Sequence, residues 1–279
     1  MSGDIIFGHG PDKAGKGTQL SILAYDAFLK GYDVEYYTFP DYSTIGGLLV
    51  DQHLRGEKEI PREVATIFYA LDRAYQAKYI KQAKQNGKIV ICKRSKWSNA
   101  AYGQVFLGLP FNDILGIDVF FPDPDIAALI DLPDQVLSSE RNRDKKDRYE
   151  KKDQTGVIEF LRKAHANGNE ISDKLKANYR FRINGRNDLI QVFDNLKSKI
   201  YPALKSKPNS SGKGSLLIIG RQEPLELEIV NQKSFGEIVK EYVNWEPQKI
   251  EIKTLNDLFK HADIQNRFRP ILEEYWSKT

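Results

Sequence analysis

The sequence predicts an α/β fold built on a parallel sheet of five strands, with helices on both faces. Short apolar runs alternate with segments of helical periodicity over residues 4–204. This alternation is typical of strand–helix–strand crossovers, which leave the strands parallel to one another. Ligands of such sheets bind in the crevice beyond the carboxyl ends of the strands, so a site is expected there.

The strands and helices of this sheet can be assigned in order. Strands are expected at the apolar runs of residues 5–7, 33–38, 89–92, 127–131 and 179–183. Helical periodicity is clear at residues 18–30 and 65–85, and a further helix at residues 188–204 would close the domain.

The composition changes after residue 204. The segment KSKPNSSGKG, residues 205–214, lacks apolar periodicity and is typical of a flexible linker. Beyond it, SLLIIG, LELEIV and KIEIKTL indicate strands, SFGEIVKEYV indicates a helix, and residues 256–276 indicate one or two more helices. We therefore expect a first domain at residues 1–204, a linker at 205–214, and a small α+β domain of unknown role at 215–279.

Composition limits the class of protein. Of the 279 residues, 41% are apolar and 29% charged, as in an ordinary globular protein. The 42 basic and 38 acidic residues permit phosphate-rich ligands but fall short of the basic excess of a dedicated nucleic-acid binder. The single cysteine, Cys92, cannot form an intramolecular disulfide, and neither a signal-peptide pattern nor a membrane-spanning run is found. A cytoplasmic location without membrane contact is expected.

A glycine-rich segment carries the clearest chemical signal. GPDKAGK, residues 10–16, fits the pattern G-x-x-x-x-G-K between a predicted strand and a predicted helix. Gly10 and Gly15 let the backbone turn its N–H groups toward phosphate oxygens, and the helix N-terminus adds favourable partial charge. Lys16 supplies a cation for the terminal phosphates of a nucleotide. The next residue is glycine rather than Ser or Thr, so Thr18 is the candidate hydroxyl for Mg²⁺.

Several motifs occur together in a familiar order. DKAGKGTQ resembles the phosphate loop D-R-A-G-K-S-T-Q, FPDYSTIGGLL resembles F-P-x-R-x-T-x-x-G, FYALDR resembles L-F-x-A-N-R, and KRSKWSNAAY resembles D-R-Y-x-x-S-x-x-A-Y. PDIAALIDLP, DRYEKK and INGRNDLIQVFDNL resemble the strand entering the lid, the lid, and the closing strand and helix. Over residues 4–204 the chain thus resembles thymidylate kinase, within the nucleoside monophosphate kinase family. The resemblance implies a three-layer P-loop kinase fold and ATP-dependent phosphorylation of dTMP or a related, modified pyrimidine deoxynucleotide.

The resemblance also implies roles for the residues that bind the acceptor. Asp12 would contact its 3′-hydroxyl, and Phe39 would line the pocket. Tyr69 would stack on the base while Arg73 donates a hydrogen bond to a base carbonyl, a pairing that selects a planar base with carbonyl acceptors. Tyr102 would lie against the sugar, where a bulky ring disfavours ribose.

The lid segment ERNRDKKDRYEKKD is dense in Arg and Lys. A charge run alone is usually a solvated face, but lids of these kinases close over the phosphates and exclude water. The resemblance places Arg141 near the adenine of ATP, and Arg143 and Arg148 within reach of the transferring phosphoryl group. Which arginine stabilises that group stays open, and Lys13 in the phosphate loop competes for the role without a planar fork.

The candidate residues fall into three sets. Those assigned to ATP are Gly10, Asp12, Lys13, Ala14, Gly15, Lys16, Gly17, Thr18 and Arg141. Those assigned to catalysis are Lys13, Lys16, Lys93, Arg94, Arg143 and Arg148. Those assigned to the acceptor are Asp12, Phe39, Tyr42, Tyr69, Arg73, Arg94, Ser98 and Tyr102. The implied cofactor is Mg²⁺ bound with ATP, and Thr18 is the metal candidate.

Two positions depart from the family pattern. Tyr42 stands where the family has the Arg of F-P-x-R, an acceptor-phosphate ligand, and Lys93 stands where it has the Asp of D-R-Y, which helps hold the hydration shell of Mg²⁺. An ammonium there repels the metal and attracts phosphate, a swing of several kcal/mol at an effective dielectric of about 20. We therefore expect Lys93 and Arg94 to face the acceptor phosphate, with Lys93 replacing the cation missing at Tyr42.

Three functional hypotheses follow from the sequence. The first is a kinase that moves the γ-phosphoryl group of ATP to dTMP or a related pyrimidine deoxynucleotide. The second is a kinase of the same fold with a different acceptor, such as a nucleotide within DNA, which the C-terminal domain would help to bind. The third is a nucleotide-binding protein that has lost catalysis. ATP and a pyrimidine deoxynucleoside monophosphate are the expected partners; a homodimer is left open, and so is nucleic acid, which the charge does not indicate.

Overall fold

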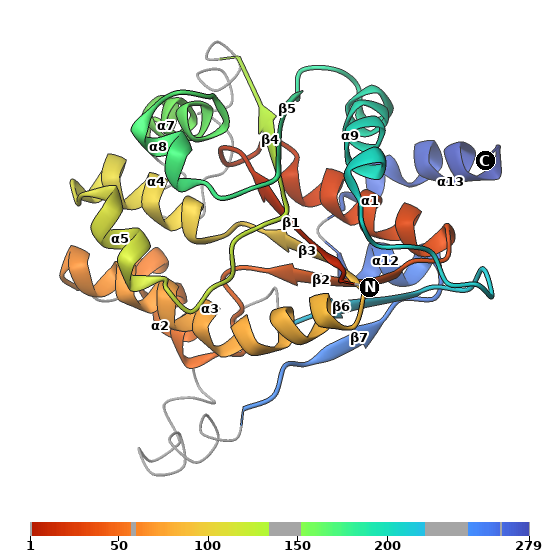
Figure 1. Ribbon diagram of the computed structural model, residues 1–279, viewed down its shortest axis with the longest axis horizontal. Coiled ribbons are helices and arrows are strands. Elements are labelled where there is room, and N and C mark those ends of the chain that lie inside the picture. Colours follow the sequence, from red (N-terminus) through yellow and green to blue (C-terminus); the bar gives the residue numbers. More distant parts are fainter. Residues whose placement is uncertain (1, 57–59, 134–151, 221–244, 263, 279) are drawn as a thin grey trace.

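A seven-stranded sheet forms the centre of the protein and has helices on both faces (Figure 1). The computed structural model describes residues 2–56, 60–133, 152–220, 245–262 and 264–278. The strand order is β5-β4-β1-β3-β2-β6-β7, and every neighbouring pair is parallel except β6 and β7. The strands are β1 Asp4–His9, β2 Asp33–Thr38, β3 Ile89–Lys93, β4 Ile126–Asp131, β5 Tyr179–Asn184, β6 Ser215–Ile219 and β7 Lys249–Glu251.

Each strand contributes to two hydrophobic cores because alternate residues point to opposite faces of the sheet. Ile6 and Ile91 belong to one core, which also contains residues of α1, α9, α12 and α13. Phe7 and Val90 belong to the other core, which contains residues of α3, α4, α5 and α7. The helices on these two faces are α1 Lys16–Leu29, α3 Arg62–Gln85, α4 Lys96–Leu107, α5 Phe111–Ile117, α7 Thr155–His165, α9 Leu189–Ala203, α12 Leu255–His261 and α13 Arg269–Ser277.

Three shorter or peripheral elements complete the described chain. They are α2 Ile45–Arg55, α8 Glu170–Lys174 and the 3-10 helix Asn266–Phe268. No helix among the described residues is both long enough and apolar enough to cross a membrane.

The predicted α/β class is confirmed, but the predicted strand number is too small. All five strands expected before residue 204 are present and parallel, and their ends agree with the expectation to within two residues. The two additional strands, β6 and β7, come from the chain beyond residue 214. KIEIKTL forms β7 at its start, and the helices expected within residues 256–276 are α12 and α13, each of which extends one residue beyond that range. The predicted strand LELEIV and helix SFGEIVKEYV lie outside the described residues.

The described part of the C-terminal segment joins the first sheet and packs into its core. Strand β6 pairs in parallel with β2, and Leu216 and Ile218 are buried in the core that α1 covers. The preceding residues 205–214, expected to be a flexible linker, are also attached to the sheet. The N–H groups of Lys205 and Ser206 donate to the Asp4 carboxylate at 2.9 and 2.7 Å. The structure therefore differs here from the expectation of a separate small domain.

Candidate active site

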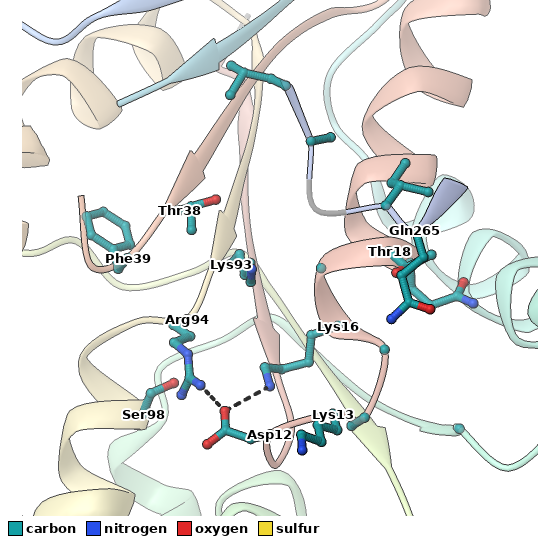
Figure 2. A pocket seen from close by; sticks show the side chains of 18 of the residues that line it. Asp12, Lys13, Lys16, Thr18, Thr38, Phe39, Lys93, Arg94, Ser98 and Gln265 are labelled. Atoms are coloured by element: carbon teal, nitrogen blue, oxygen red, sulfur yellow. Dashed lines mark hydrogen bonds and ion pairs between the residues drawn. The ribbon is translucent and has the colours of Figure 1, made fainter. Parts of the chain in front are cut away.

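Three loops that follow β1, β2 and β3 meet at the carboxyl edge of the sheet (Figure 2). The N–H of Phe39 donates to the carbonyl oxygen of Lys93 at 3.1 Å, and the N–H of Arg94 donates to that of Gly8 at 3.2 Å. These bonds lie just past the paired strand ends and hold the three loops together. A cavity of about 1990 Å³ opens there, and the phosphate loop forms part of its wall.

The phosphate loop leads from β1 into α1, as the sequence predicts. Gly15 precedes the helix with φ at +78°, a left-handed conformation that glycine adopts without steric strain. Lys16 is only 5% exposed, and its Nζ donates to the Pro11 carbonyl at 2.6 Å and lies 3.8 Å from Oδ1 of Asp12. A helix N-terminus beside a lysine ammonium is a favourable place for phosphate oxygens.

Asp12 lies at the centre of a cluster of polar side chains. Arg94 forms an ion pair with Oδ1 of Asp12, which Figure 2 shows between Arg94 and Lys16. The Tyr102 hydroxyl and Nε2 of Gln154 both lie 2.7 Å from Oδ2 of Asp12. Burial acts to raise the pKa of Asp12, but Arg94 and then Lys16 oppose it, and the pKa falls well below its usual range. Asp12 is therefore a charged acceptor that orients three donors.

Two residues of the site have an unusual backbone conformation. Lys13 and Arg94 have φ of +65° and +69°, and they are the only residues other than glycine with positive φ in the described chain. Such a conformation costs about 1–3 kcal/mol and is found at functional sites. The guanidinium of Arg94 also lies over the ring of Tyr102, 5.2 Å from its centroid. The positive φ turns the chain after β3, and the Asp12 and Tyr102 contacts then fix the guanidinium.

On the part of the cavity wall that α3 forms, Arg73 is already paired with a carboxylate. Its Nε and Nη2 donate to the two oxygens of Asp118 at 2.7 and 2.6 Å, and both side chains are almost fully buried. Asn99 donates a further bond to Asp118 at 3.2 Å. Tyr69 lies one turn earlier on α3 and lines the same cavity. The predicted base-recognition pair therefore sits at the cavity with its arginine held rigidly by Asp118.

The loop between β2 and α2 is held by two aspartates. The N–H of Asp41 donates to both oxygens of Asp72 at 3.1–3.2 Å, and the Thr44 hydroxyl lies 2.7 Å from Oδ1 of Asp72. Nε2 of Gln76 donates to Oδ2 of Asp41 at 2.6 Å. Burial, with the charge of Asp41 as a second cause, raises the pKa of Asp72 to about 8. Asp72 is thus mostly protonated at neutral pH.

Lys93 ends β3 and lines the cavity, where Figure 2 shows it between Thr38 and Lys16. Among the described residues that line the cavity, only Asp12 and Asp188 carry carboxylates. Asp12 pairs with Arg94, and Asp188 accepts the N–H of Gln191 at the start of α9. The family pattern has a carboxylate at residue 93, and no other carboxylate on the described part of the cavity wall takes its place.

A buried chain of imidazoles lies behind the phosphate loop. Nδ1 of His9 is 2.9 Å from Nε2 of His165, and Nε2 of His9 is 2.8 Å from the Ser95 hydroxyl. Burial is the largest cause that lowers the pKa of each ring, and the pKa of His165 falls to about 3. Both rings are neutral at pH 7, and they connect the end of β1 to the residue after Arg94.

Nearly all of the predicted site residues lie around this one cavity. Its wall includes Asp12, Lys13, Ala14, Gly15, Lys16, Gly17, Thr18, Phe39, Tyr42, Tyr69, Arg73, Lys93, Arg94, Ser98 and Tyr102. Gly10 is not part of the wall, and Arg141, Arg143 and Arg148 lie outside the described residues. The C-terminal segment contributes to the wall as well, with Gln265 on the same side as Thr18 (Figure 2).

Sequence reasoning missed four polar residues that organise the site. Asp41 and Asp72 lie inside the FPDYS and ALDR motifs, so their positions were visible although their contact was not. Asp118 and Gln154 lie in segments without a motif, 45 and 142 residues from their partners Arg73 and Asp12.

The parallel sheet, the phosphate loop at its carboxyl edge and an adjoining cavity lined by aromatic and cationic residues define a P-loop kinase of the nucleoside monophosphate type. A family model for thymidylate kinase matches residues 9–192, two thirds of the chain. The chain belongs to the thymidylate kinase family.

Individual relatives agree with this assignment. The chain is 32% identical over 182 residues to a probable thymidylate kinase of Pyrococcus abyssi, a match that covers 63% of this chain and 86% of the relative. It is 33% identical over 170 residues to the thymidylate kinase of Desulfotalea psychrophila, covering 61% and 82%. The solved structure of thymidylate kinase from Candida albicans superposes with a TM-score of 0.57 at 23% identity, covers 72% of this chain and 92% of that chain, and supports the fold.

Proposed function

We propose that this protein transfers the γ-phosphoryl group of ATP to dTMP, giving ADP and dTDP. A phosphate oxygen of dTMP forms the new bond to the γ-phosphorus, and the bond from that phosphorus to the β,γ-bridging oxygen breaks. The observation that carries the proposal is that the phosphate loop and the candidate acceptor residues line one cavity in a member of the thymidylate kinase family. One cavity allows the two nucleotides to be held in line, which is most of what phosphoryl transfer requires.

The donor end of the site is the phosphate loop and the start of α1. Lys16 would leave its bond to the Pro11 carbonyl, which it makes at 2.6 Å, for the β- and γ-phosphates of ATP. The N-terminus of α1 supplies N–H groups and partial positive charge for the same oxygens. Lys13 in the loop is a second cation at this end.

The acceptor end is the wall formed by α3, α4 and the loop after β2. Tyr69 would stack on the thymine ring, and Arg73, oriented by Asp118, would donate to a base carbonyl. Arg94 would turn from Asp12 toward the acceptor phosphate, leaving Asp12 to accept the 3′-hydroxyl. Tyr102 lies beside Asp12 at 2.7 Å, so its ring would occupy the space that a 2′-hydroxyl needs.

Mg²⁺ would enter this site as part of the MgATP substrate. Mg²⁺ in kinase sites is held largely by phosphate oxygens and water, with few protein ligands. The donors on this wall fit that mode, because Thr18 offers one hydroxyl and the phosphate oxygens and water would supply the other ligands. Lys93 stands where the family pattern has a carboxylate and offers no oxygen to the metal. The ammonium of Lys93 would instead neutralise phosphate charge, and Thr18 is the residue we assign to the metal.

The same ammonium favours one second candidate function, nucleotide binding without transfer. A cation in place of the family's carboxylate weakens metal positioning, and phosphate binding does not depend on that carboxylate. Under this alternative the chain binds ATP and dTMP but releases no ADP.

A coupled ADP-release assay distinguishes these functions. The protein is supplied with MgATP and, in turn, dTMP, dUMP, UMP, dCMP, dGMP or single-stranded DNA, with Lys16→Ala as the inactive control. We expect turnover to be fastest with dTMP and to be lost in the control. Turnover confined to another acceptor would overturn the proposal, and binding of both nucleotides by calorimetry without ADP release would establish the second candidate.

A further inference from the structure

Trp245 of the C-terminal segment contacts the loop that precedes α2. Its indole Nε1 donates to the carbonyl oxygen of Ser43 at 3.0 Å, across 202 residues of sequence. Ser43 lies in the loop of residues 39–44, which follows β2 and carries Phe39 and Tyr42 on the cavity wall. The bond therefore connects a part of the chain beyond the thymidylate kinase match, which ends at residue 192, to the candidate acceptor loop.

The same indole also packs on α3, which lines the same cavity. Its ring lies 5.5 Å from that of Tyr75 and 6.2 Å from that of Tyr79, both edge to face. Both tyrosines belong to α3, which also carries Tyr69 and Arg73. Trp245 thus bridges the acceptor loop and the helix that we assign to base recognition.

A second contact of the C-terminal segment reaches the same loop. Gly220 directly follows β6 with φ at +87°, and a Cβ built on it would lie 2.4 Å from Oδ2 of Asp41. Its N–H donates to the Gln248 carbonyl at 2.8 Å, so the approach is held by the β6–β7 pairing. A side chain at residue 220 would have to displace the Asp41 carboxylate, and the positive φ also favours glycine there. Gly220 itself lines the cavity.

The strand before this loop is held on both sides. In the sheet, β2 pairs with β3 over residues 34–38 and with β6 over residues 33–37. The acceptor loop therefore starts from an inner strand, is approached by Gly220 and is bonded by Trp245. Three independent contacts of one C-terminal segment converge on residues 33–44.

We propose that Trp245 is a positioning residue for the acceptor nucleotide, and that the C-terminal segment holds the loop of residues 39–44 in its binding conformation. Trp245 acts through Ser43 and α3 and does not itself touch the reacting atoms. The inference rests on the proposed function, because it names dTMP as the ligand whose binding depends on the loop. A loop held in place before binding loses less conformational entropy when the acceptor arrives.

The test compares two matched substitutions, Trp245→Phe and Trp276→Phe. Each keeps an aromatic ring and removes one indole donor. Trp276 donates to Asp26 at 3.5 Å and packs on Tyr25 on the other face of the sheet, away from the acceptor loop. Calorimetry measures the dissociation constants of dTMP and ATP separately, and the ADP-release assay gives KM and kcat. Thermal unfolding of each variant reports its folded fraction.

We expect Trp245→Phe to weaken dTMP binding roughly three- to tenfold, the effect of one lost hydrogen bond, with ATP binding changed by less than about twofold. Trp276→Phe should leave both dissociation constants within about twofold. Equal effects of Trp245→Phe on the two nucleotides, or no effect on dTMP, would overturn the inference. If the wild-type protein binds dTMP but does not phosphorylate it, the proposed function fails. The inference about Trp245 is still tested in that case, because it depends on the comparison of dissociation constants.

A spectroscopic readout separates positioning from a merely structural role. Indole fluorescence depends on the surroundings of the ring, and dTMP that orders the loop of residues 39–44 changes those surroundings for Trp245. We expect the dTMP-dependent change in emission to be much smaller in Trp245→Phe than in Trp276→Phe, with the contribution of Trp97, which both variants keep, as the common background. Equal dTMP responses in the two variants would show that the loop and the indole of Trp245 are not coupled, and the inference would fail.

Discussion

Arg73 and Asp118 form a bidentate ion pair that is almost fully shielded from water, with the two side chains 2% and 1% exposed. The pair uses Nε and Nη2 of the guanidinium and fixes its plane beside the cavity. Removal of one partner of a buried pair leaves the other charge uncompensated, which costs about 3–5 kcal/mol. The arginine that we assign to base recognition is therefore also a structural residue.

Arg73→Ala is predicted to lower the free energy of unfolding by about 3–5 kcal/mol. Urea unfolding at pH 7 measures this, with Lys278→Ala as the control, because Lys278 pairs with Glu274 on the exposed surface. The control should leave the stability unchanged. If Arg73→Ala were as stable as the control, the guanidinium would have to be paired elsewhere, and Asp118 could not be its anchor.

Lys16→Ala is predicted to reduce kcat by at least about 10²-fold, because it removes a cation that acts on the phosphates in the transition state. The side chain of Lys16 lines the cavity, and its Nζ bonds to the phosphate loop itself, at the Pro11 carbonyl. Because the substitution removes no part of the hydrophobic core, the fold should survive. Steady-state rates and circular dichroism check the two parts. Lys253→Ala, at a lysine that is 70% exposed, serves as the charge-matched control. Comparable rates in Lys16→Ala and the control would contradict the phosphate-loop assignment.

The protonation of Asp72 predicts a pH dependence of stability. Its folded-state pKa of about 8 lies above the unfolded value, so the stability that it contributes is complete below pH ~4 and is lost as the pH rises through 8. The buried histidines act in the opposite direction, because their lowered pKa values cost stability as the pH falls below about 6.5. A comparison with a variant that cannot titrate at residue 72 is therefore needed.

Asp72→Asn imitates the protonated side chain and keeps an oxygen for the N–H of Asp41. We expect its stability relative to the wild type to improve by at least about 1 kcal/mol between pH 6 and pH 9, because up to about pH 8 the folded wild-type carboxyl holds a proton that the unfolded one has lost. Urea unfolding at intervals across this range measures the difference. Parallel stability curves for the two proteins would mean that Asp72 is ionised throughout.

The sequence predicted β1, β3 and β4 because each contains a continuous apolar run, as expected for strands with both faces covered. Strands β2 and β5 mix aromatic or aliphatic residues with charged ones, and β5 lies at the edge of the sheet. It also identified SLLIIG as a strand, but the partner of that strand depends on which sheet edge it meets. The pairing of Leu216 with Val34 is one of five such contacts across about 180 residues, and no local pattern encodes it. The composition of residues 205–214 was misleading for a related reason: the N–H groups of Lys205 and Ser206 bond to Asp4, about 200 residues away in the sequence.

The residues of the candidate site could likewise be predicted from the sequence only where they belong to a local motif. The phosphate loop is one continuous segment, so its residues and their roles follow from a local motif. Arg73 was recognised at the pocket, but Asp118, which orients it, follows it by 45 residues and has no motif of its own. The same holds for Gln154, which bonds Asp12. Local motifs thus specify the residues that line the cavity, and only the folded chain shows the residues that hold them.

Truncation after Leu204 is predicted to disrupt the fold, although the composition of residues 205–214 is typical of a linker between independent domains. It removes β6 from the β2 edge and takes the buried residues Leu216, Ile218 and Leu272 out of the core beneath α1. Each such side chain contributes roughly 1.5–3 kcal/mol through burial. Thermal unfolding of the truncated protein should be uncooperative, or should occur at a much lower temperature.

A point substitution tests the same claim in the full chain. Ile218→Ala should cost about 2–5 kcal/mol, since it leaves a cavity in the core. Ile271→Ala, at a side chain that is 43% exposed, should cost much less. Equal and small effects of the two substitutions, together with a cooperative transition of the truncated protein, would show that the C-terminal segment is an independent unit.

The last prediction concerns Lys93 and Tyr42, the two departures from the family pattern. If the missing carboxylate limits metal positioning, Lys93→Asp should strengthen Mg²⁺-dependent catalysis only once Tyr42→Arg restores a cation for the acceptor phosphate. The two effects should then be non-additive, because both residues line the same cavity and would act on the same phosphate. If Lys93 has instead become the phosphate cation of a working kinase, Lys93→Asp should lower the rate in either background, because it places negative charge beside a dianionic phosphate.

The measurement is kcat/KM with dTMP for the wild type, the two single variants and the double variant at one fixed Mg²⁺ concentration. We expect Lys93→Asp to reduce kcat/KM by at least about tenfold in both backgrounds, since one charge–phosphate contact at an effective dielectric of about 20 exceeds 1.4 kcal/mol. A gain confined to the double variant would instead identify Lys93 as the cause of impaired catalysis. Four equal rates would mean that the ammonium does not act on the phosphates, and that the charge inversion at the end of β3 has no catalytic consequence.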